Sequence, residues 1–573
     1  MSAASTGRRG SAPAAPDQGT SRPPDAEAPA GARTRWAAVE RWLPVAVVAA
    51  VMVVLGLWGL ARHNAMGNDE VASRWAATLS LGRLFHLLGN LDAVHGLYYL
   101  LLHCWIAVGS TPTIIRIPSV VFMTVAAGLV VVLARRLTGS AWAGLFAGLI
   151  MALDPVISYY AQTARSYAMV FCCVVAATLV LVLALESEDE ARAGEALARR
   201  RLRSRWIAYA ALITVGGYLN ELSLLVLAAH AVTVLLTRYG RPTVRHWLVS
   251  GAVGAILVLP VVGLSITQAA ADTGATRPDL HDMQVLFHDY FGATILVAVG
   301  MLVLAVFAVL PGAALPAIRI WRPRAASPAA GAQVSSAWWQ SGGFSLPSVA
   351  VPLLVLPSFL LVAESLVGKA LYSDRYILYC EAGAALLAGA GVYRLGQWAG
   401  PWLGRRLAGW REQGGEGWRS FVWLPGVLVC VIALVLQFGA QQRTRTPQSR
   451  QFDFGDPAFY IEKHAQAGDG VLFFNTFYRK ITLGYPQDFR DVTDFSLAVS
   501  PAKAGTYNGI NKPLADVRSL MLRYRRIWVV GHYPSARASA SAVGGESELL
   551  LSRFTLVAKR HFKGMEVTLW QRG

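Results

Sequence analysis

The sequence predicts an all-α protein that crosses a membrane many times and carries a small α/β domain near its C-terminal end. Its residues are 54% hydrophobic and only 15% charged, whereas about a quarter of the residues in soluble domains are charged. The apolar residues fall in blocks of about 18 to 20, the length that spans a bilayer core. After residue 440 these blocks give way to short β-rich runs, which are typical of an α/β domain.

The N-terminal 38 residues are rich in Ala, Pro, Gly, Ser and Arg and contain almost no large apolar side chains. Such a composition cannot bury a core, so we expect 1–38 to be a disordered cytoplasmic tail. The first apolar block, 43–61, is longer than the hydrophobic part of a cleaved leader peptide. It is interpreted as a signal-anchor helix, the first helix of a membrane domain over 39–440.

About eleven membrane-spanning helices are expected from runs with few or no charges. They are 43–61, 117–134, 141–158, 167–185, 207–219, 222–237, 247–266, 291–318, 346–363, 376–393 and 422–440. The apolar run 95–109 is short and rich in aromatic residues, which favours an interfacial helix lying along the membrane over a twelfth span.

Loop charge predicts the orientation. With the N-terminus inside, most loop arginines before residue 440 lie on the inner side, including the arginine-rich segment 192–205, and this excess is typical of cytoplasmic loops. An odd number of spans then places 441–573 outside. The multi-pass protein is expected in a bacterial plasma membrane. Membrane topology also explains the net charge of +18 better than a nucleic-acid partner does.

The extracytoplasmic region 441–573 is expected to fold as a small α/β domain. A helix is predicted at 456–467 and strands at 471–475, 527–531, 554–558 and 566–570,. The region contains no glycine-rich phosphate loop and no cysteine. A packing or binding module without chemistry is therefore the favoured interpretation. The five cysteines of the chain all lie in apolar stretches without metal-ligand spacing, so no metal site is predicted.

The first outer loop, 62–116, begins with two adjacent acids, Asp69 and Glu70. A carboxylate near the membrane surface can accept a proton from a hydroxyl group. The simpler alternative is that these residues cap a helix at 70–80. Further along the loop, Asp92 and His95 precede a Tyr98–Tyr99 segment, where Asp92 is either a helix cap or a substrate contact.

Two later outer segments carry cations beside tyrosines. Arg165 lies among Tyr159, Tyr160 and Tyr167, where it either binds a phosphate or extends to the membrane interface. The segment 364–381 contains Lys369, Asp374, Arg375 and Tyr376. Its two cations could bind a phosphate. Alternatively, Asp374 and Arg375 form a local helix cap and ion pair. Glu221 lies in a short outer loop, and the spans themselves contain Glu381 and His230.

The segment 67–119 resembles the first loop of the GT-C membrane glycosyltransferases. The shared features are the acidic pair Asp69–Glu70, an Asp-x-x-His from Asp92 to His95, and an Arg-x-Pro-Ser from Arg116 to Ser119. The branch most similar contains bacterial proteins related to dolichyl-phosphate-mannose protein mannosyltransferases and to the lipid A aminoarabinose transferase. The runs YYAQTARSYAM and SDRYILY resemble two further elements of that branch. The resemblance covers most of 40–573.

This resemblance implies a GT-C-type helical bundle that transfers a sugar, with inversion, from a polyprenyl-phosphate donor to an acceptor hydroxyl. It implies Asp69 as the base and Arg165 and Arg375 as donor-phosphate ligands. We add Glu70 as a catalytic candidate beside Asp69, and Lys369 as a further phosphate ligand from its place in 364–381. Acceptor or sugar contacts are expected at Asp92, His95, Tyr160, Gln162, Tyr167, Glu221 and Tyr376. Two features depart from the family pattern. Thr163 stands where the family usually has a glutamate, so a second acid comes from Asp154, Glu221 or Asp92, or is absent. Gly96 stands where the family has two prolines after the histidine.

No cofactor is required for this chemistry, although adjacent acids could bind a divalent cation. The sugar is expected to be mannose or a pentose. The acceptor class stays open among a glycan, a lipid and a protein. Two alternatives belong to other functional classes: a transporter or lipid flippase, which would need polar residues at the middle of several spans, and a non-catalytic scaffold presenting 441–573.

Overall fold

The structure is a computed structural model that describes residues 30–61, 65–192, 196–237, 239–268, 277–310, 344–408, 423–450, 452–531 and 545–573. It divides into two compact units, Met1–Leu43 and Pro44–Gly573. Residues 1–29 of the predicted disordered tail lie outside the described residues. Helix α1, Ala30–Leu57, includes residues 30–38, so the expectation of disorder is wrong there. The alanines and arginines of this stretch have high helix propensity.

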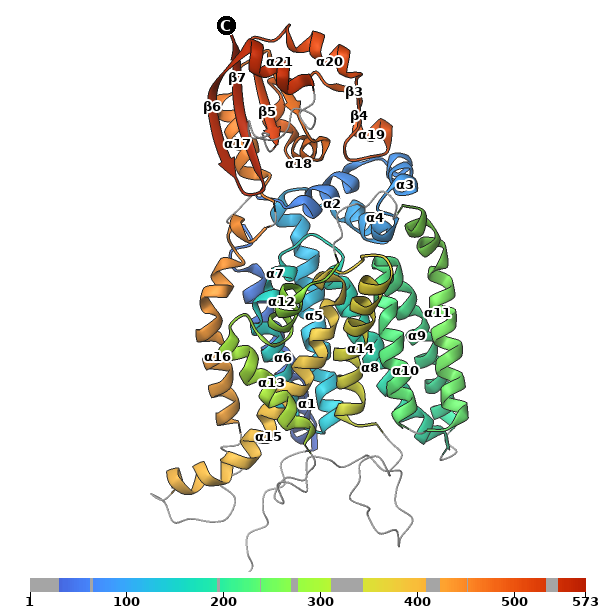
Figure 1. Cartoon of the computed structure of the whole chain (residues 1–573). Coiled ribbons are helices and arrows are strands. Elements are labelled where there is room, and N and C mark those ends of the chain that lie inside the picture. The colour runs from blue at the N-terminus through green and yellow to red at the C-terminus, as the bar shows by residue number, and fades with distance from the viewer. Residues whose placement is uncertain are drawn as a thin grey trace, which may run out of the picture. The chain divides into compact units, whose positions relative to one another are not determined.

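Each of the eleven predicted spans coincides with helical structure. The matching helices after α1 are α5 (Pro112–Thr138), α6 (Ala141–Leu153), α7 (Pro155–Ala161), α8 (Tyr167–Arg192), α9 (Ala196–Leu219), α10 (Val226–Thr237), α11 (Arg241–Gln268), α13 (Ile295–Val309), α14 (Leu346–Val367), α15 (Glu381–Ala408) and α16 (Leu424–Arg443). Short 3₁₀ turns, η2 (Glu221–Leu225) and η4 (Asp374–Cys380), precede α10 and α15. The helices from α5 to α16 form one helical bundle within Pro44–Gly573 (Figure 1).

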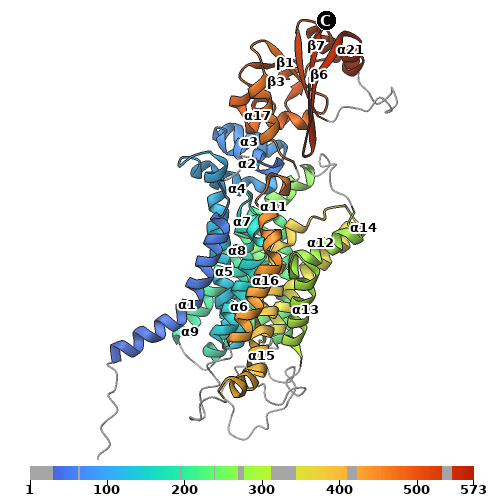
Figure 2. The ribbon, with the colours of Figure 1, turned by 90° about the vertical axis from the view of Figure 1, so that its left-hand side faces the viewer.

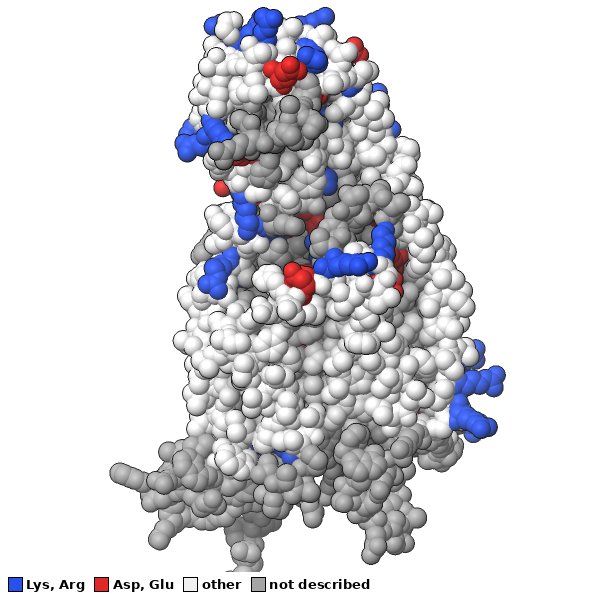
Figure 3. Space-filling view, in the orientation of Figure 1, with Lys and Arg blue, Asp and Glu red and all other residues white. Residues whose placement is uncertain are grey.

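By length and composition, six helices among the described residues can cross a membrane, or up to eight if each of two bent pairs counts as one span. On the face shown in Figure 3, the bundle surface is almost bare of charged side chains over a broad band, with charged side chains above and below it. Exposed leucines, isoleucines and valines cover helices such as α11 and α13. An apolar belt of this kind fits a lipid environment, so the chain is a multi-pass membrane protein.

The span predicted at 141–158 is broken. Helices α6 and α7 meet at an angle of 69° around Asp154. Pro155 lacks the N–H needed to continue α6, and the Asp154 carboxylate accepts a bond of 3.0 Å from the Val156 N–H to start a new helix,. Helix α12 (Leu280–Phe291) and α13 form a second bent pair, at 67°, so the span predicted from 291 begins only at Ile295.

Glycines of α15 let neighbouring helices approach closely. A Cβ atom on Gly389 would overlap the backbone of Ala147 in α6, and one on Gly391 would overlap the Leu304 carbonyl in α13. One on Gly383 would lie 2.7 Å from the Ala350 oxygen in α14. Small residues at helix contacts are the usual means of close packing in membranes, and they place α15 at the centre of the bundle.

The first outer loop is helical and lies at one end of the bundle. It contains α2 (Asn68–Thr78), α3 (Leu81–Asn90), the 3₁₀ turn η1 (Ala93–His95) and α4 (Gly96–Trp105). These helices lie between the bundle and the C-terminal region (Figures 1 and 2). The segment expected to be an interfacial helix is thus α4, which is too short to span a bilayer.

The C-terminal region folds around a five-stranded sheet of order β2-β1-β5-β7-β6. Strands β1 (Asp469–Phe473), β2 (Val492–Asp494) and β5 (Arg526–Gly531) are parallel, whereas β6 (Phe554–Phe562) and β7 (Met565–Arg572) are antiparallel to their neighbours. All four predicted strands are present. The remaining elements are β3 (Leu497–Val499), β4 (Ile510–Asn511), α17 (Gly455–His464), α18 (Lys480–Gly484), α19 (Pro501–Ala504), α20 (Leu514–Met521) and α21 (Gly545–Arg553).

Candidate active site

Asp69 lies in the first turn of α2 and faces two arginines. Arg375 Nη1 donates to its Oδ2 at 3.1 Å, and Arg165 Nη2 lies 3.9 Å from its Oδ1. The Tyr167 hydroxyl is 3.5 Å from Oδ2. The first turn of a helix also favours a negative charge. Three segments far apart in sequence therefore meet at one carboxylate, which remains 23% exposed and accessible to a ligand.

Glu70, the next residue, points to a different side of α2, and its carboxylate oxygens are bound by donors of this chain. Arg116 binds both of its oxygens, at 2.7 and 2.8 Å. The Ala164 N–H donates at 3.0 Å, and the Gly67 N–H donates at 3.3 Å as part of the helix cap. Glu70 is only 1% exposed. This geometry joins α2, α5 and the loop after α7, and it gives Glu70 a structural position rather than access to a substrate.

Arg165 lies in the loop between α7 and α8 and is buried among acceptors. Its Nη1 donates to the Tyr99 hydroxyl at 2.6 Å and to Ser73 Oγ at 3.3 Å. Its Nη2 lies between Asp69 and Asp92, 3.8 Å from the latter. Within the described residues its Nε has no hydrogen-bond partner. A buried guanidinium with an unused N–H has remaining capacity for an anionic ligand.

Asp92 and His95 complete the acidic side of this cluster. Asp92 has a left-handed backbone, with φ of 59°, which Asp tolerates better than most residues. Its Oδ2 accepts bonds of 2.7 Å from the Tyr99 and Tyr507 hydroxyls. His95 is buried, with Nδ1 3.4 Å from the Ser166 hydroxyl. Of the three acids considered to replace the missing glutamate, Asp92 is the one that shares an arginine with Asp69.

Tyrosines form a wall beside Asp69. The rings of Tyr160 and Tyr167 pack edge to face at 5.4 Å, and Tyr376 lies 6.5 Å from Tyr167. The Arg375 guanidinium lies over the Tyr376 ring at 5.6 Å. All three aromatic residues were expected at the site. Aromatic rings of this kind offer apolar faces beside polar edges.

Neighbouring arginines keep both Asp69 and Glu70 ionised, although burial opposes the ionisation of both carboxylates. Burial alone would raise the pKa of Asp69, but Arg165 and Arg375 outweigh it and lower this pKa to about 2. Burial likewise opposes ionisation of Glu70, and Arg116 and Arg450 lower its pKa to about 2. Burial and Arg165 lower the pKa of His95 to about 3. The imidazole is therefore neutral at physiological pH.

Gln162 and Glu221 bind groups outside this cluster. Gln162 donates to the carbonyls of Gly56 and Trp58 at 3.0 and 2.8 Å, which ties the end of α1 to the α7–α8 loop. Glu221 accepts a bond of 2.7 Å from Ser265 in α11. Lys369 is exposed after α14. Gln162 and Glu221 are thus engaged by groups of this chain, and the substrate contacts expected for them, like the phosphate contact expected for Lys369, stay predictions.

The two polar residues noted within the spans are buried. His230 contacts the hydroxyls of Thr178 and Tyr209 at 3.0 and 2.9 Å, so its ring nitrogens have partners. Glu381 begins α15 and is 1% exposed. Hydrogen-bonded burial of His230 is a sufficient structural explanation for it.

Residues after α16 contribute to the site in a way that the sequence did not predict. Arg450 donates to Thr163 Oγ1 at 2.6 Å and to the Gln162 carbonyl at 2.8 Å. Its Nε lies 3.8 Å from Glu70. Thr163, which occupies the place of the family's glutamate, therefore binds an arginine of this chain. Lys480, in the C-terminal domain, donates to the Asn68 side chain at 2.9 Å.

A cavity of about 600 Å³ adjoins the tyrosine wall. Tyr160 lines it, together with Asp154, Asp289 and Asp374, the residue before Arg375. The other lining residues come mainly from α7, α12 and the end of α16. Pockets for small molecules usually measure about 300 to 1,000 Å³, so this cavity can hold a sugar. Tyr160 links it to Tyr167 and hence to Asp69.

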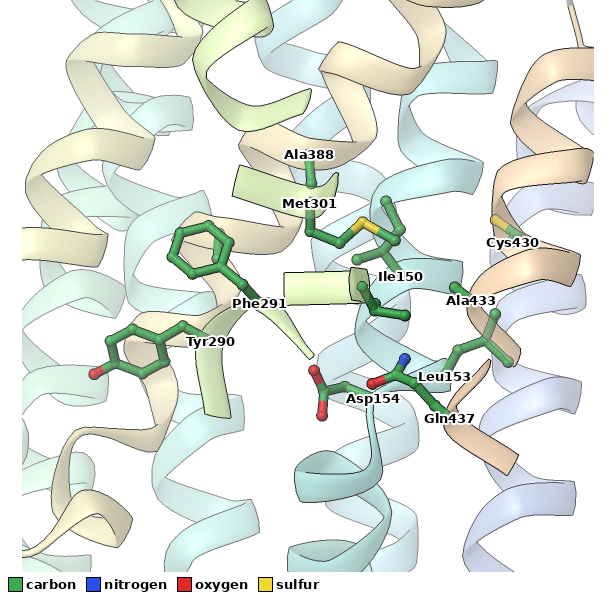
Figure 4. Close-up of a pocket in the computed structure, with 12 residues that line it drawn as sticks. Ile150, Leu153, Asp154, Tyr290, Phe291, Met301, Ala388, Cys430, Ala433 and Gln437 are labelled. Atoms are coloured by element: carbon green, nitrogen blue, oxygen red, sulfur yellow. The ribbon is translucent and has the colours of Figure 1, made fainter. Parts of the chain in front are cut away.

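A second cavity, of about 10 Å³, lies deeper between α6, α13, α15 and α16. Figure 4 shows Asp154 and Gln437 at one end of it, with Phe291, Met301 and Ile150 forming an apolar remainder. Such a space holds about one water molecule and is too small for a sugar. Among the described residues, no group of three or more His, Cys, Asp or Glu side chains is arranged to hold a metal ion.

Comparison with known proteins defines the class of this fold. Residues 96–264 match the model of the family described as dolichyl-phosphate-mannose-protein mannosyltransferase. The apo structure of ArnT from Cupriavidus metallidurans matches with a TM-score of 0.52 and 14% identity, over 94% of this chain and 98% of that chain. The chain therefore has the ArnT-like GT-C fold, and the resemblance to GT-C glycosyltransferases of the PMT/ArnT type is confirmed.

Two further structures are similar at lower TM-scores. ArnT from Cupriavidus metallidurans bound to undecaprenyl phosphate matches with a TM-score of 0.48 and 15% identity, over 92% of this chain and 97% of that chain. AglB from Archaeoglobus fulgidus, in complex with an inhibitory peptide and a dolichol-phosphate, matches at 0.45 and 12%, over 94% and 74%. A search of curated proteins finds no match.

Proposed function

We propose that this protein transfers a sugar from a polyprenyl-phosphate donor to an acceptor hydroxyl at the outer face of the membrane, with Asp69 as the general base. The observation that carries the proposal is the position of Asp69 between Arg165 and Arg375, at the end of a lipid-exposed bundle. The match of residues 96–264 to a family named for a lipid-phosphate sugar donor supports this substrate class.

The two arginines suit the charge change of the reaction. A polyprenyl-phosphate sugar is a phosphodiester with one negative charge, whereas the departing polyprenyl phosphate gains a second charge. Arg165 and Arg375 bind this growing charge more strongly in the transition state than in the ground state, which is the condition for catalysis. Within the part of the chain that the structure describes, the Nε groups of both side chains have no hydrogen-bond partner, so they provide additional donors for phosphate oxygens.

The proton and electrons balance in a single displacement. The acceptor oxygen forms a bond to the anomeric carbon, and its proton passes to Asp69. The bond between that carbon and the phosphate oxygen breaks, and its electron pair leaves with the phosphate. Attack on the face opposite the phosphate inverts the anomeric configuration. A positioned carboxylate contributes about 10² to 10⁴-fold to such a step.

Donor binding also prepares Asp69 for this role. With a pKa of about 2, the carboxylate is a weak base while both arginines pair with it. A phosphate that binds Arg165 and Arg375 competes for those positive charges and therefore raises the pKa of Asp69. The base becomes effective only when the donor is present, which limits unproductive chemistry in the empty site.

The cavity beside Tyr160 is the proposed place of the transferred sugar. Its carboxylates accept hydrogen bonds from sugar hydroxyls, and Tyr159 and Tyr160 offer ring faces,. Mannose or a pentose is the sugar that the resemblance favours, and a glycan, lipid or protein supplies the acceptor. The Cupriavidus protein of the same fold has also been solved with undecaprenyl phosphate, a lipid of the proposed donor class.

The test is sugar transfer by the purified full-length protein in lipid nanodiscs, with a panel of labelled polyprenyl-phosphate sugars and membrane extracts as acceptors. Wild type should transfer at least one of these sugars. Asp69→Asn should lose about 10² to 10⁴-fold of that activity while keeping its thermal midpoint. Asp491→Asn, the same change at an exposed turn of the C-terminal domain, is the matched control and should retain most of the activity. Full activity in Asp69→Asn would refute the assigned base.

A further inference from the structure

A loop of the C-terminal domain, residues 505–509, reaches the first outer loop. It follows α19, which lies beside α3 (Figure 1). Gly505 and Gly509 have left-handed φ values of 64° and 66°, which glycine adopts without strain. A Cβ atom on Gly505 would lie 2.5 Å from the Asn90 side chain of α3. The two glycines thus allow close docking and direct Tyr507 toward the bundle.

Tyr507 connects this loop to the buried arginine. Its hydroxyl donates to Asp92 Oδ2 at 2.7 Å and lies 3.1 Å from the Tyr99 hydroxyl. Tyr99 donates to the same Asp92 oxygen and accepts a bond from Arg165 Nη1. Tyr507 itself is 7% exposed, and its ring packs edge to face on Trp75 at 5.5 Å. A continuous hydrogen-bonded network therefore joins the C-terminal domain to Arg165.

The network determines how close the Asp92 carboxylate lies to Arg165. Two tyrosine hydroxyls hold Oδ2 of Asp92, so this carboxylate stays 3.8 Å from Arg165 and does not form a close ion pair with it. Without the Tyr507 hydroxyl, Asp92 loses one of its donors and is free to move toward Arg165. A close Asp92–Arg165 pair would occupy guanidinium N–H groups that a phosphate needs.

We infer that Tyr507 is a positioning residue that keeps Arg165 available to the donor phosphate, so the C-terminal domain is a part of the donor site. This inference rests on the proposed function. It also contradicts the expectation that 441–573 is a module without a role in the chemistry. Lys480 of the same domain supports the assignment, because it binds Asn68 next to Asp69 and packs 5.1 Å from the Tyr507 ring.

The test compares Tyr507→Phe with wild type in three measurements. We expect roughly a tenfold rise in the donor KM and a similar loss of affinity for undecaprenyl phosphate, the size expected for one hydrogen bond to a charged group. The acceptor KM and the thermal midpoint should not change. Tyr524→Phe is the matched control, because Tyr524 packs on Phe495 within the domain core, and it should behave as wild type.

A double-mutant cycle separates positioning from general destabilisation. If Tyr507 acts through Arg165, Tyr507→Phe combined with Arg165→Lys should bind undecaprenyl phosphate no more weakly than Arg165→Lys alone. Should Tyr507→Phe fold poorly, Asp92→Asn removes the same link from the other side. Because an asparagine cannot form the competing ion pair with Arg165, Asp92→Asn is expected to bind undecaprenyl phosphate at least as tightly as wild type, and a tenfold weaker binding would overturn the inference.

The possible outcomes distinguish this inference from the proposed function. Wild-type donor KM and phosphate affinity in Tyr507→Phe would overturn the inference alone, as would additive losses in the cycle. Wild-type protein that neither binds undecaprenyl phosphate nor transfers any sugar would overturn the proposed function, and the inference with it.

Discussion

Asp69 and Glu70 are neighbours in sequence but have different environments. Successive residues of a helix point about 100° apart, so the first turn of α2 directs Asp69 toward Arg165 and Arg375 and Glu70 toward Arg116. Asp69 keeps some exposure, whereas Glu70 is sealed by donors on every side. The motif of two acids therefore combines a reactive group with a structural group, and the structural one determines the orientation of α2.

The buried pair of Glu70 and Arg116 predicts a pH-dependent stability. The pKa of Glu70 falls from 4.5 to about 2 on folding, so its contribution is complete above pH 4.5 and is lost as the pH falls toward 2. The shift corresponds to roughly 3 kcal/mol. We expect the thermal midpoint of wild type in detergent to drop through this window, and that of Glu70→Gln to be lower at pH 7 and to change less.

The comparison isolates Glu70 because other groups titrate in both proteins. His95, with a folded pKa of about 3, also destabilises the fold as the pH falls below 6.5, and it does so in both. Equal pH dependence of wild type and Glu70→Gln between pH 4.5 and 2 would show that the ion pair does not contribute as described.

Among the elements, α15 organises the bundle through its glycines. It contacts α6, α13 and α14 on different sides, and Gly389, Gly391 and Gly383 remove the side chains that would separate these helices. The central position of α15 matters for the site because η4, which carries Arg375, leads directly into it. Packing in the middle of the bundle thus determines the position of an arginine at its outer end.

A single methyl group tests this packing. Alanine normally stabilises a helix by about 1 kcal/mol relative to glycine, so Gly300→Ala on α13, where nothing lies within 4 Å, should leave the thermal midpoint equal or higher. Gly391→Ala should lower it, because the new Cβ meets the Leu304 carbonyl. The measurement is thermal unfolding in detergent, together with the monodisperse fraction. A midpoint raised in both variants would contradict the contact.

For the whole molecule, the arrangement of charge and apolar surface predicts an orientation. The candidate site and the C-terminal domain lie at one end of the bundle (Figure 1). The exposed arginines of 199–203 lie near the start of α9, at the opposite end of this helix from Leu219. Arginine-rich ends face the cytoplasm. We therefore expect the site to open on the outer side, where polyprenyl-linked sugars and envelope acceptors meet.

Cysteine labelling in intact cells measures this orientation. In a background without Cys104, the exposed native cysteine, Ser552→Cys on α21 should react with a membrane-impermeant maleimide before lysis. Ser204→Cys on α9 should react only after the membrane is permeabilised. Because both positions are exposed on the protein surface, labelling depends on whether the maleimide can reach that side of the membrane. The reverse labelling pattern would place the C-terminal domain in the cytoplasm and remove the proposed acceptor side.

Hydropathy and local motifs determined the class of this protein without tertiary information. Blocks of apolar residues located the helices, and strand-like runs located β1, β5, β6 and β7, because these signals depend on residues close together in the chain. The acidic pair at Asp69 and the lone Arg165 stood out for the same reason. The break at Asp154 was missed, although Asp-Pro is a local signal for a new helix start.

Only the tertiary structure decided which of these residues share a site. Tyr507 meets Asp92 across 415 positions of sequence, and Lys480 meets Asn68 across 412. It also separated Asp69 from Glu70, and it placed Gln162 and Glu221 in contacts outside the cluster around Asp69. Such contacts arise from the packing of helices against a distant domain. No local periodicity encodes them, because the same side chains would fit many solvated loops equally well.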